Sequence, residues 1–342
     1  MTAADQRDQN VKFPLANRGR PHMTKLERAT APTLYFFGVT TAKSSIMKVF
    51  PAWAKQLGLR DAVIKGVDFP LHAPPDAYRA AVTFLKEDPK SLGALVTTHK
   101  IDLYHDCRDL FDVIDPHALF MGETSCLSKQ DGKLACHAKD PISSGLALDG
   151  FLPEGHFEQT GAEVFSMGAG GSTIALTWRL MQKTRGADRP ARIIVSNRSP
   201  ARLEEIRRIH AELHSGVPTE YVLAPQASGN DAVLATLRPN SLVINATGLG
   251  KDAPGSPLTN EARFPERSIV WDLNYRGDLV FLDQARAQET SRSLQIEDGW
   301  TYFLHGWTQV IAEVFHIRIP AHGPEFETLS EIARSTVATP TV

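Results

Sequence analysis

The feature that most constrains the fold of this chain is a glycine-rich turn at residues 167–176, MGAGGSTIAL. EVFSM before it predicts a buried strand, and STIALTWRLM after it predicts a helix. A strand, a tight glycine turn and a helix together bring backbone N–H groups and a helix N-terminus to a place where a pyrophosphate can bind. The pattern is G-x-G-G-S and not G-x-G-x-x-G, so the string also fits a structural strand-to-helix turn.

Strand and helix patterns alternate on both sides of this turn, which indicates an α/β fold with parallel sheets and covering helices. In the first half we expect strands at 33–40, 62–69 and 94–96, helices at 44–57, 77–88 and 101–111, and a hairpin within 125–140. Asp131-Gly132 is the turn signal of that hairpin. In the second half we expect strands at 163–167, 191–197, 241–250 and 268–275, helices at 172–183, 200–214 and 282–289, and a final long amphipathic helix from 298 followed by a polar tail.

Bulk properties exclude several classes of protein. A length of 342 residues suggests about two domains, which the patterns join near 141–148. A net charge of −2 gives no electrostatic reason to bind nucleic acid or an acidic membrane, and no apolar run approaches the ~20 residues of a membrane span. The polar N-terminus lacks the apolar stretch of a secretory signal, and three cysteines fit a reducing compartment. We therefore expect a cytoplasmic protein, monomeric or homodimeric, with a small-molecule substrate and no nucleic-acid or membrane partner.

The end of the second strand bears on which dinucleotide would bind. An acidic residue that could hold the ribose 2′-hydroxyl of NAD is absent there, and Asn197, Arg198, Ser199 and Arg202 are present instead. Guanidinium groups and a hydroxyl suit a 2′-phosphate, although RLEEIRR also reads as an arginine-rich helix face. We expect NADP in preference to NAD. The residues expected to bind it are Gly168, Gly170, Gly171, Ser172, Asn197, Arg198, Ser199, Arg202, Asn245, Thr247 and Gly248.

The order of motifs resembles the shikimate/quinate dehydrogenase family over almost the whole chain. The motifs are VFSMGAGGS, SNRSPARLEEI, VINATGLG, DLNYRGDLVFLDQA and DGWTYFLHG. The resemblance implies reversible hydride transfer between NAD(P)H and a ring carbonyl, a Lys–Asp pair in an interdomain cleft and no metal. The polar N-terminus predicts an arm at 1–31. After it we expect a substrate-binding and catalytic domain at 32–141, completed by a C-terminal helix at 299–330, and a Rossmann NADP-binding domain at 142–298.

The catalytic pair follows from this resemblance. The family pattern N-V-T-x-P-x-K aligns with LVTTHK at 95–100 with one residue deleted, and N-T-D aligns with AKD at 138–140. Lys100 is then the acid/base that stabilises and protonates the alkoxide, and Asp140 orients it and supports its charge. The alternative is that Lys100 is an ordinary surface lysine beyond a strand end.

The polar residues around this pair differ from the family pattern. Ser44 of S-x-S-P is kept but its second serine is Ile46, the asparagine of N-V-T is Leu95, and that of G-A-V-N-T is Ser125. Such losses leave shikimate hydroxyls without partners, so we expect shikimate to be a poor substrate and a differently substituted ring to be the true one. The residues expected to bind substrate are Ser44, Thr97, Ser125, Tyr275 and His305, the last at the glutamine of D-G-x-x-M-L-x-x-Q-G. Ser44 and Ser45 also fit a helix N-cap.

The leading hypothesis is an NADP-dependent oxidoreductase of the shikimate dehydrogenase type that acts on a shikimate-like or cyclitol-like ring. The alternatives are an NAD-dependent quinate or cyclitol dehydrogenase and a non-catalytic ligand-binding regulator that kept the fold. The histidines and cysteines lack tight zinc spacing, so no metal site is expected. Trp300, Tyr302 and Trp307 fit a core or cleft wall better than a base-stacking platform, and no G-x-S-x-G elbow indicates a hydrolase.

Overall fold

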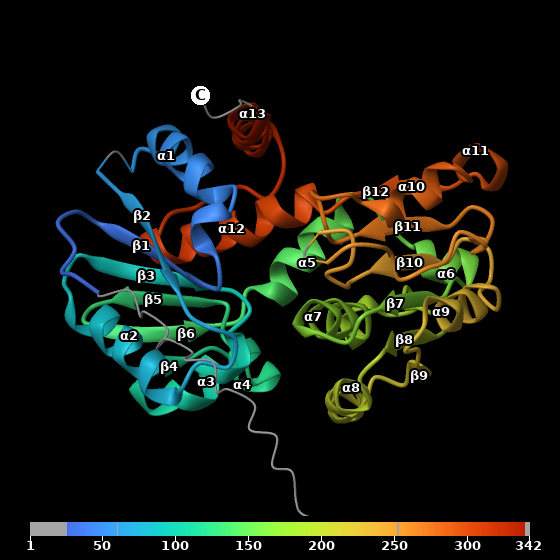
Figure 1. Ribbon diagram of the computed structural model, residues 1–342, viewed down its shortest axis with the longest axis horizontal. Coiled ribbons are helices and arrows are strands. Elements are labelled where there is room, and N and C mark those ends of the chain that lie inside the picture. Colours follow the sequence, from blue (N-terminus) through green and yellow to red (C-terminus); the bar gives the residue numbers. More distant parts are fainter. Residues whose placement is uncertain (1–25, 60, 252, 339–342) are drawn as a thin grey trace, which may run out of the picture.

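Two six-stranded sheets lie side by side, each covered by helices (Figure 1). The computed structural model describes residues 26–59, 61–251 and 253–338. Most of the expected polar arm, residues 1–25, lies outside the described residues. The predicted α/β class, with two α/β units in sequence order, is confirmed.

The first sheet is mixed and has the strand order β2-β1-β3-β5-β6-β4. β1 is parallel to β2 and β3, whereas β5 is antiparallel to both β3 and β6. The predicted hairpin is β5 and β6, and both Asp131 and Gly132 in its turn have positive φ. The predicted helix at 101–111 is a shorter α-helix followed by a 3-10 turn. The elements are β1 Thr33–Gly38, α1 Ile46–Gln56, β2 Val63–Asp68, α2 Pro75–Glu87, β3 Ser91–Val96, α3 Lys100–Cys107, β4 Val113–Ile114, α4 Pro116–Met121, β5 Cys126–Gln130 and β6 Lys133–His137, with 3-10 turns at Thr41–Lys43 and Arg108–Leu110.

The second sheet is entirely parallel, with the order β12-β11-β10-β7-β8-β9. β7 and β10 are neighbours at its centre, and the chain leaves them toward opposite edges, which creates a topological switch point. Ligands of open α/β sheets bind at the carboxyl ends of such strands. The elements are α6 His156–Thr160, β7 Val164–Met167, α7 Gly171–Leu180, β8 Ile193–Asn197, α8 Pro200–Leu213, β9 Thr219–Leu223, α9 Ala227–Leu234, β10 Leu242–Asn245, β11 Ile269–Asp272, α10 Val280–Arg286, α11 Glu289–Arg292 and β12 Gln295–Glu297, with a 3-10 turn at Lys183–Arg185.

Two helices join the sheets. α5 (Asp140–Asp149) leads from the first sheet to the second, and α12 (Trp300–Phe315) leads back (Figure 1). α12 buries Leu304, Ile311 and Val314 in the same core as residues of β1 and α1. Because both helices cross between the sheets, the space at their N-termini is bounded by residues from both halves of the chain.

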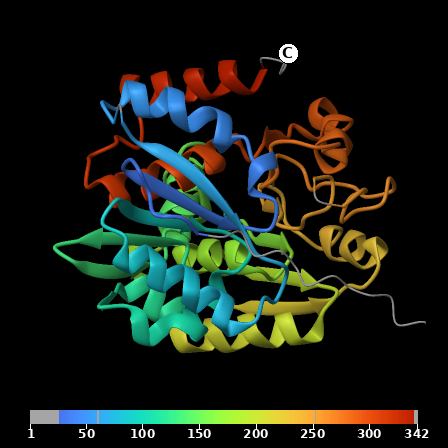
Figure 2. The same cartoon turned by 60° about the vertical axis from the view of Figure 1, so that its left-hand side comes forward.

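The C-terminal segment differs from the prediction. The expected helix at 299–330 is two helices, and the expected polar tail contains α13 (Pro324–Ala338). α12 ends at Phe315 because His316 takes a left-handed conformation, and Pro324 opens α13 at a first-turn position that tolerates proline. α13 packs along α1 (Figure 2), and the Trp53 indole N–H donates to the carbonyl of Leu329 at 2.8 Å. Among the described residues, no helix is long and apolar enough to cross a membrane.

Candidate functional site

The glycine turn lies between the carboxyl ends of β7 and β10. Gly168 has a φ of +113°, and a Cβ on it would lie 2.5 Å from the carbonyl oxygen of Ala246. Only glycine combines this conformation with so close a backbone approach. Gly170 is the N-cap of α7, and a Cβ on it would meet no atom within 4 Å. The space beside Gly170 is therefore open, and the free N–H groups at a helix N-terminus suit an anion.

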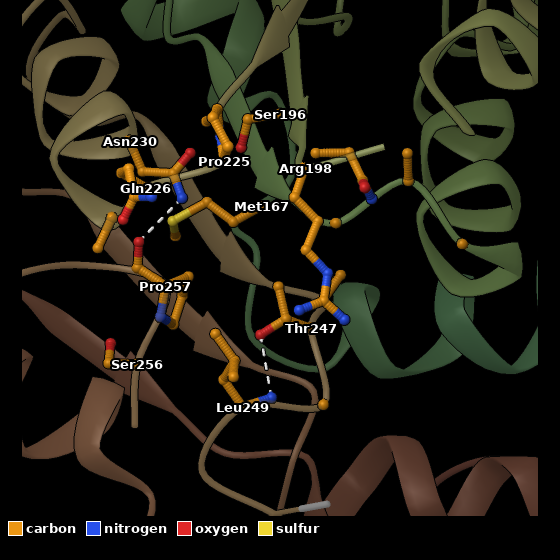
Figure 3. Close-up of a pocket in the computed structure, with 18 of the residues that line it drawn as sticks. Met167, Ser196, Arg198, Pro225, Gln226, Asn230, Thr247, Leu249, Ser256 and Pro257 are labelled. Atoms are coloured by element: carbon orange, nitrogen blue, oxygen red, sulfur yellow. Dashed lines mark hydrogen bonds between the residues drawn. The ribbon is translucent and has the colours of Figure 1, made fainter. Parts of the chain in front are cut away.

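A cavity of about 470 Å³ opens in front of this turn (Figure 3). Its lining combines backbone, small polar side chains and one guanidinium, and suits an elongated polar ligand. Arg198 extends its guanidinium toward Thr247. The lining residues are Met167, Gly168, Ala169, Gly170, Ser196, Asn197, Arg198, Ala224, Pro225, Gln226, Ala227, Asn230, Ala246, Thr247, Gly248, Leu249, Ala253, Ser256 and Pro257. Pro225, Gln226 and Asn230 were not among the predicted site residues, because no motif marks them.

The other polar groups after β8 serve the local structure. The Asn197 carboxamide oxygen accepts from the N–H of Ser199 at 2.8 Å, and the Ser199 hydroxyl caps α8 at the N–H of Arg202. The Arg202 guanidinium donates to Glu205 at 2.8 Å. Neither Ser199 nor Arg202 lines the cavity. Of the two arginines predicted to bind the cofactor, Arg198 lines the cavity and Arg202 does not.

Asn245 has a supporting position. It is fully buried, and its amide donates to both carboxylate oxygens of Asp272 at 3.1 Å. Its oxygen accepts from the backbone N–H of Thr247 at 3.0 Å and from the Thr247 hydroxyl at 2.6 Å. Asn245 therefore holds the turn that presents Thr247 and Gly248, and these two residues line the cavity.

A second cavity of about 370 Å³ lies between the two sheets. It shares Ala246, Thr247 and Gly248 with the first cavity, so the two adjoin. It contains both predicted catalytic residues and Ser172 of the glycine turn. The lining residues are Leu95, Val96, Thr97, Lys100, Ser125, Lys139, Asp140, Ser143, Ser172, Ala246, Thr247, Gly248, Lys251, Leu273, Asn274, Tyr275, Gly299, Tyr302, Phe303, Gly306, Trp307 and Val310.

Lys100 and Asp140 form an ion pair in this cleft. Each is the first residue of a helix, α3 and α5, and the ammonium donates to Oδ2 of the carboxylate. Their side chains are 20% and 12% exposed. Burial acts to lower the pKa of Lys100, but Asp140 and Glu123 outweigh it and raise that pKa above its usual value. The pair thus supplies a protonated ammonium held in place by a carboxylate.

The short loop from β3 to α3 positions Lys100. Thr98 has a φ of +51°, a conformation that β-branched residues rarely adopt. His99 next to it is buried, and its Nδ1 forms a hydrogen bond with the Tyr78 hydroxyl at 2.9 Å. The left-handed Thr98 turns the chain between the end of β3 at Val96 and the start of α3 at Lys100.

Two further titratable groups near the pair were missed in the sequence. Glu123 is only 4% exposed, and burial raises its pKa to about 7 against the opposing effect of Lys100. The Tyr302 hydroxyl donates to the Ser172 hydroxyl at 3.3 Å, and burial raises the pKa of Tyr302. A glutamate in place of the alanine of G-A-V-N-T was the available signal for Glu123.

The expected substrate residues divide into two groups. Thr97, Ser125 and Tyr275 line the cleft. The Ser125 hydroxyl oxygen accepts from the N–H of Lys139 at 2.7 Å, and the Tyr275 hydroxyl donates to Ser45 at 3.2 Å. The lining also has an apolar part, which is built from Leu95, Phe303, Trp307 and Val310.

Ser44 and His305 are not brought to the cleft. His305 stacks on Phe326 of α13, with ring centroids 4.5 Å apart, and is buried there. α12 is continuous from Trp300, so counting from Gly299 without a gap puts Gly306 at the glutamine position, and Gly306 lines the cleft. Ser44 ends a 3-10 turn, and its neighbour Ser45 meets Tyr275 instead. His305 and Ser44 therefore lie outside the lining of the cleft, unlike Thr97, Ser125 and Tyr275.

Lys139 is a cation in the cleft that the family pattern did not predict. Its ammonium donates to Glu313 of α12 at 2.6 Å, and Glu313 also lies 3.4 Å from Nε2 of His137. Within the described part of the chain, no cluster of three or more His, Cys, Asp or Glu side chains could hold a metal ion.

Comparison with known proteins gives the family relationship. No family model matches the chain. The NADP(+) shikimate dehydrogenase of Lactococcus lactis is 27% identical over 223 residues, which cover 62% of this chain and 73% of that enzyme. The chain is thus similar to shikimate dehydrogenases, in agreement with the resemblance of its motifs.

Solved structures of shikimate and quinate dehydrogenases share the fold of this chain. The quinate dehydrogenase of Corynebacterium glutamicum, in complex with NAD, has a TM-score of 0.68 at 19% identity and covers 89% of this chain and 99% of its own. The shikimate 5-dehydrogenase of Thermus thermophilus, in complex with NADP(H) and shikimate, has a TM-score of 0.65 at 21% identity, with the same coverage. The predicted two-domain fold class is thus shared with these proteins.

Proposed function

We propose that this protein is an NADP-dependent oxidoreductase that transfers hydride reversibly between the nicotinamide and a ring ketone or alcohol of a shikimate-like or cyclitol-like substrate. The observation that carries the proposal is the Lys100–Asp140 pair in a cleft that adjoins the dinucleotide-type cavity. The shikimate dehydrogenase relatives support the same class of reaction.

In the mechanism, NADP supplies or accepts the hydride when it is bound. Lys100 holds a proton at Nζ and would deliver it to the developing alkoxide oxygen, where its positive charge also stabilises the transition state. Asp140 keeps the ammonium charged and oriented through the hydrogen bond to Oδ2. Proton transfer by a positioned side chain typically contributes about 10²–10⁴-fold to the rate.

The lining of the cleft supports a substrate other than shikimate. Leu95 and Gly306 occupy positions where the family pattern has polar amides, and Phe303 and Trp307 extend the apolar surface. A polyhydroxylated ring placed against such a wall loses hydrogen bonds, which costs several orders of magnitude in selectivity when many are lost. We infer a ring with fewer polar substituents on the side facing α12.

The first experiment is an NADP⁺-reduction screen of the purified protein with shikimate, quinate, aminated analogues and simple cyclitols. We expect turnover of at least one member, with shikimate markedly slower than the preferred substrate. Turnover of shikimate at the rate of an ordinary family member would contradict the substrate proposal, while NADP⁺ reduction itself would still support the reaction class.

Lys100→Ala is the first variant to test. We expect kcat to fall by about 10²–10⁴-fold with little change in the dissociation constant of NADP⁺, because the ammonium acts on the reacting oxygen. A Lys100→Ala protein that keeps its rate would contradict the mechanism. Lys90→Ala, on the loop before β3, is the control and should retain kcat.

NAD is the second candidate cofactor, because Arg202 is paired with Glu205 and Arg198 is the predicted cation that lines the cavity. Arg198→Ala separates the two. If Arg198 holds a 2′-phosphate, the variant should lose about tenfold or more in kcat/KM with NADP⁺ and little with NAD⁺. Equal losses with the two cofactors would favour NAD.

A further inference from the structure

Glu123 is a buried carboxyl group at the boundary between the two sheets. It follows α4 and the left-handed Gly122, and the next residue, Thr124, donates its backbone N–H to the carbonyl of Lys100 at 3.1 Å. Glu123 is 4% exposed, and among the described residues its Oε1 has no hydrogen-bond partner. A buried, unpartnered carboxyl oxygen is unfavourable for stability, so its retention calls for a functional reason.

The Glu123 carboxyl is aimed at the first turn of α7. A Cβ on Gly171 would lie 2.8 Å from Oε2 of Glu123, and the three atoms nearest to that position all belong to this carboxyl group. Gly171 is the first residue of a ten-residue helix that follows the glycine turn. The Glu123 carboxyl belongs to the first half of the molecule and α7 to the second. An anion bound at the glycine turn would therefore lie at the same positive helix end as Glu123.

The charges that face Glu123 come from four helices. Lys100 of α3 favours its ionised form, while Asp140 of α5 and Glu205 of α8 oppose it. Tyr302 of α12 also faces Glu123, whose negative charge acts to raise the pKa of this tyrosine. Since Lys100 is already paired with Asp140, it cannot fully neutralise a second carboxylate.

We propose that Glu123 makes binding of the dinucleotide diphosphate at the α7 N-terminus proton-linked, with the carboxyl taking up one proton from solvent as the diphosphate binds. This inference rests on the proposed function, since it requires a dinucleotide at the glycine turn. Ionised Glu123 and the diphosphate repel each other and compete for the same helix end. The protonated acid removes the repulsion and can donate a hydrogen bond through its O–H.

The sign of the effect follows from linkage. If Glu123 is protonated in the complex and ionised in the free protein, binding requires uptake of a proton. Binding then weakens as the pH rises, by up to tenfold for each pH unit above the pKa of the group in the free protein. The pKa of about 7 for Glu123 puts this change between pH 6 and pH 8.5. The 2′-phosphate of NADP also titrates near pH ~6, so the wild type must be compared with a variant at the same pH.

The experiment measures the dissociation constant of NADP⁺ from pH 6 to pH 8.5 for the wild type and Glu123→Gln. Glutamine has the same shape and cannot ionise. We expect similar constants at pH 6 and about tenfold tighter binding by the variant at pH 8.5. Calorimetry at pH 8 in two buffers of different ionisation enthalpy should count about one proton fewer taken up by the variant. Glu212→Gln, on the far part of α8, is the matched control and should follow the wild type.

A second pair of variants tests the contact itself and guards against misfolding of the first. Gly171→Ala should weaken NADP⁺ binding in the wild-type background, because the methyl group displaces the Glu123 carboxyl. In a Glu123→Ala background the same substitution should have a smaller effect, because the three atoms nearest to the new methyl group have gone. If Gly171→Ala changes NADP⁺ binding equally in both backgrounds, the Glu123 carboxyl does not contact the first turn of α7.

The outcomes separate this inference from the proposed function. NADP⁺ binding with the same pH dependence and proton count in the wild type and Glu123→Gln overturns the inference and leaves the function intact. Failure of the wild type to bind NADP⁺ or NAD⁺ at any pH overturns the function, and the inference with it.

Discussion

At the residue scale, the cleft contains two sets of side chains: a charged pair that matches the family motifs and surrounding residues that differ from them. Lys100 and Asp140 meet as an ion pair although 40 positions separate them in the sequence. Around them, Leu95, Gly306 and Lys139 differ from the family pattern in size, polarity or charge. We therefore expect that substitutions can alter the proposed acid/base function and the proposed substrate preference independently.

Restoring the family residues should shift the preference toward shikimate. Leu95→Asn with Gly306→Gln adds two amides to the cleft wall, each able to contribute about 1 kcal/mol through a hydrogen bond to a ring hydroxyl. We expect kcat/KM for shikimate to rise by roughly tenfold or more, measured by NADP⁺ reduction. Leu92→Asn, on the same strand but outside the cleft lining, is the control. No gain over this control would mean that the wall does not contact the substrate.

Residues of the site that lie in recognisable motifs could be predicted from the sequence, whereas residues whose position depends on tertiary packing could not. Lys100 and Asp140 were predicted from the resemblance to family motifs, and the glycine turn from its strand–turn–helix context; the structure places all of them on two adjoining cavities. His305 was predicted from a shortened motif, whereas α12 is continuous and the ungapped count gives Gly306. Glu123 was missed because burial against α7 depends on how two distant segments pack, and no local pattern reports that.

Among the elements, the hairpin was predicted from its local sequence pattern and the C-terminal helix α13 was not. Asp131-Gly132 specifies a tight turn by its conformational preference, and β5 and β6 follow from it. α13 was expected as polar tail because its apolar residues are sparse. Phe326, Leu329 and Ala333 nevertheless recur at helical spacing and cover α1.

Truncating the buried face of α13 should destabilise the first half of the protein. Leu329 is 2% exposed, and its carbonyl accepts the Trp53 indole N–H. We expect Leu329→Ala to lower the free energy of unfolding by about 2–5 kcal/mol, measured by urea denaturation. The exposed Glu331→Ala in the same helix should change it by less than about 0.5 kcal/mol. Similar values for both variants would mean that α13 is not docked.

For the molecule as a whole, buried neutral histidines link stability to pH. Burial lowers the pKa of His210, in the second half, and of His305, between α12 and α13, to about 4 in each case. The unfolded chain binds these protons near pH ~6.5. Above that pH the two histidines do not reduce the free energy of unfolding. As the pH falls from about 6.5 to 4, protonation of the unfolded state lowers the free energy of unfolding.

His305→Phe should reduce this acid sensitivity. Phenylalanine keeps the stack on Phe326 and has no proton to gain. We expect the wild type to lose more stability than the variant between pH 7 and pH 4.5, by on the order of 2 kcal/mol. Urea denaturation at the two pH values measures the difference. The exposed His322→Phe should behave like the wild type, and a parallel decline of all three proteins would contradict the prediction.

The two crossings of the chain, α5 and α12, have a mechanical consequence. Two covalent connections restrict movement of one half against the other more than a single linker would. Asp140 is the first residue of one connection, so its ion pair with Lys100 lies beside a covalent link between the halves. The approach of Glu123 to Gly171 has no such link beside it and depends on packing alone.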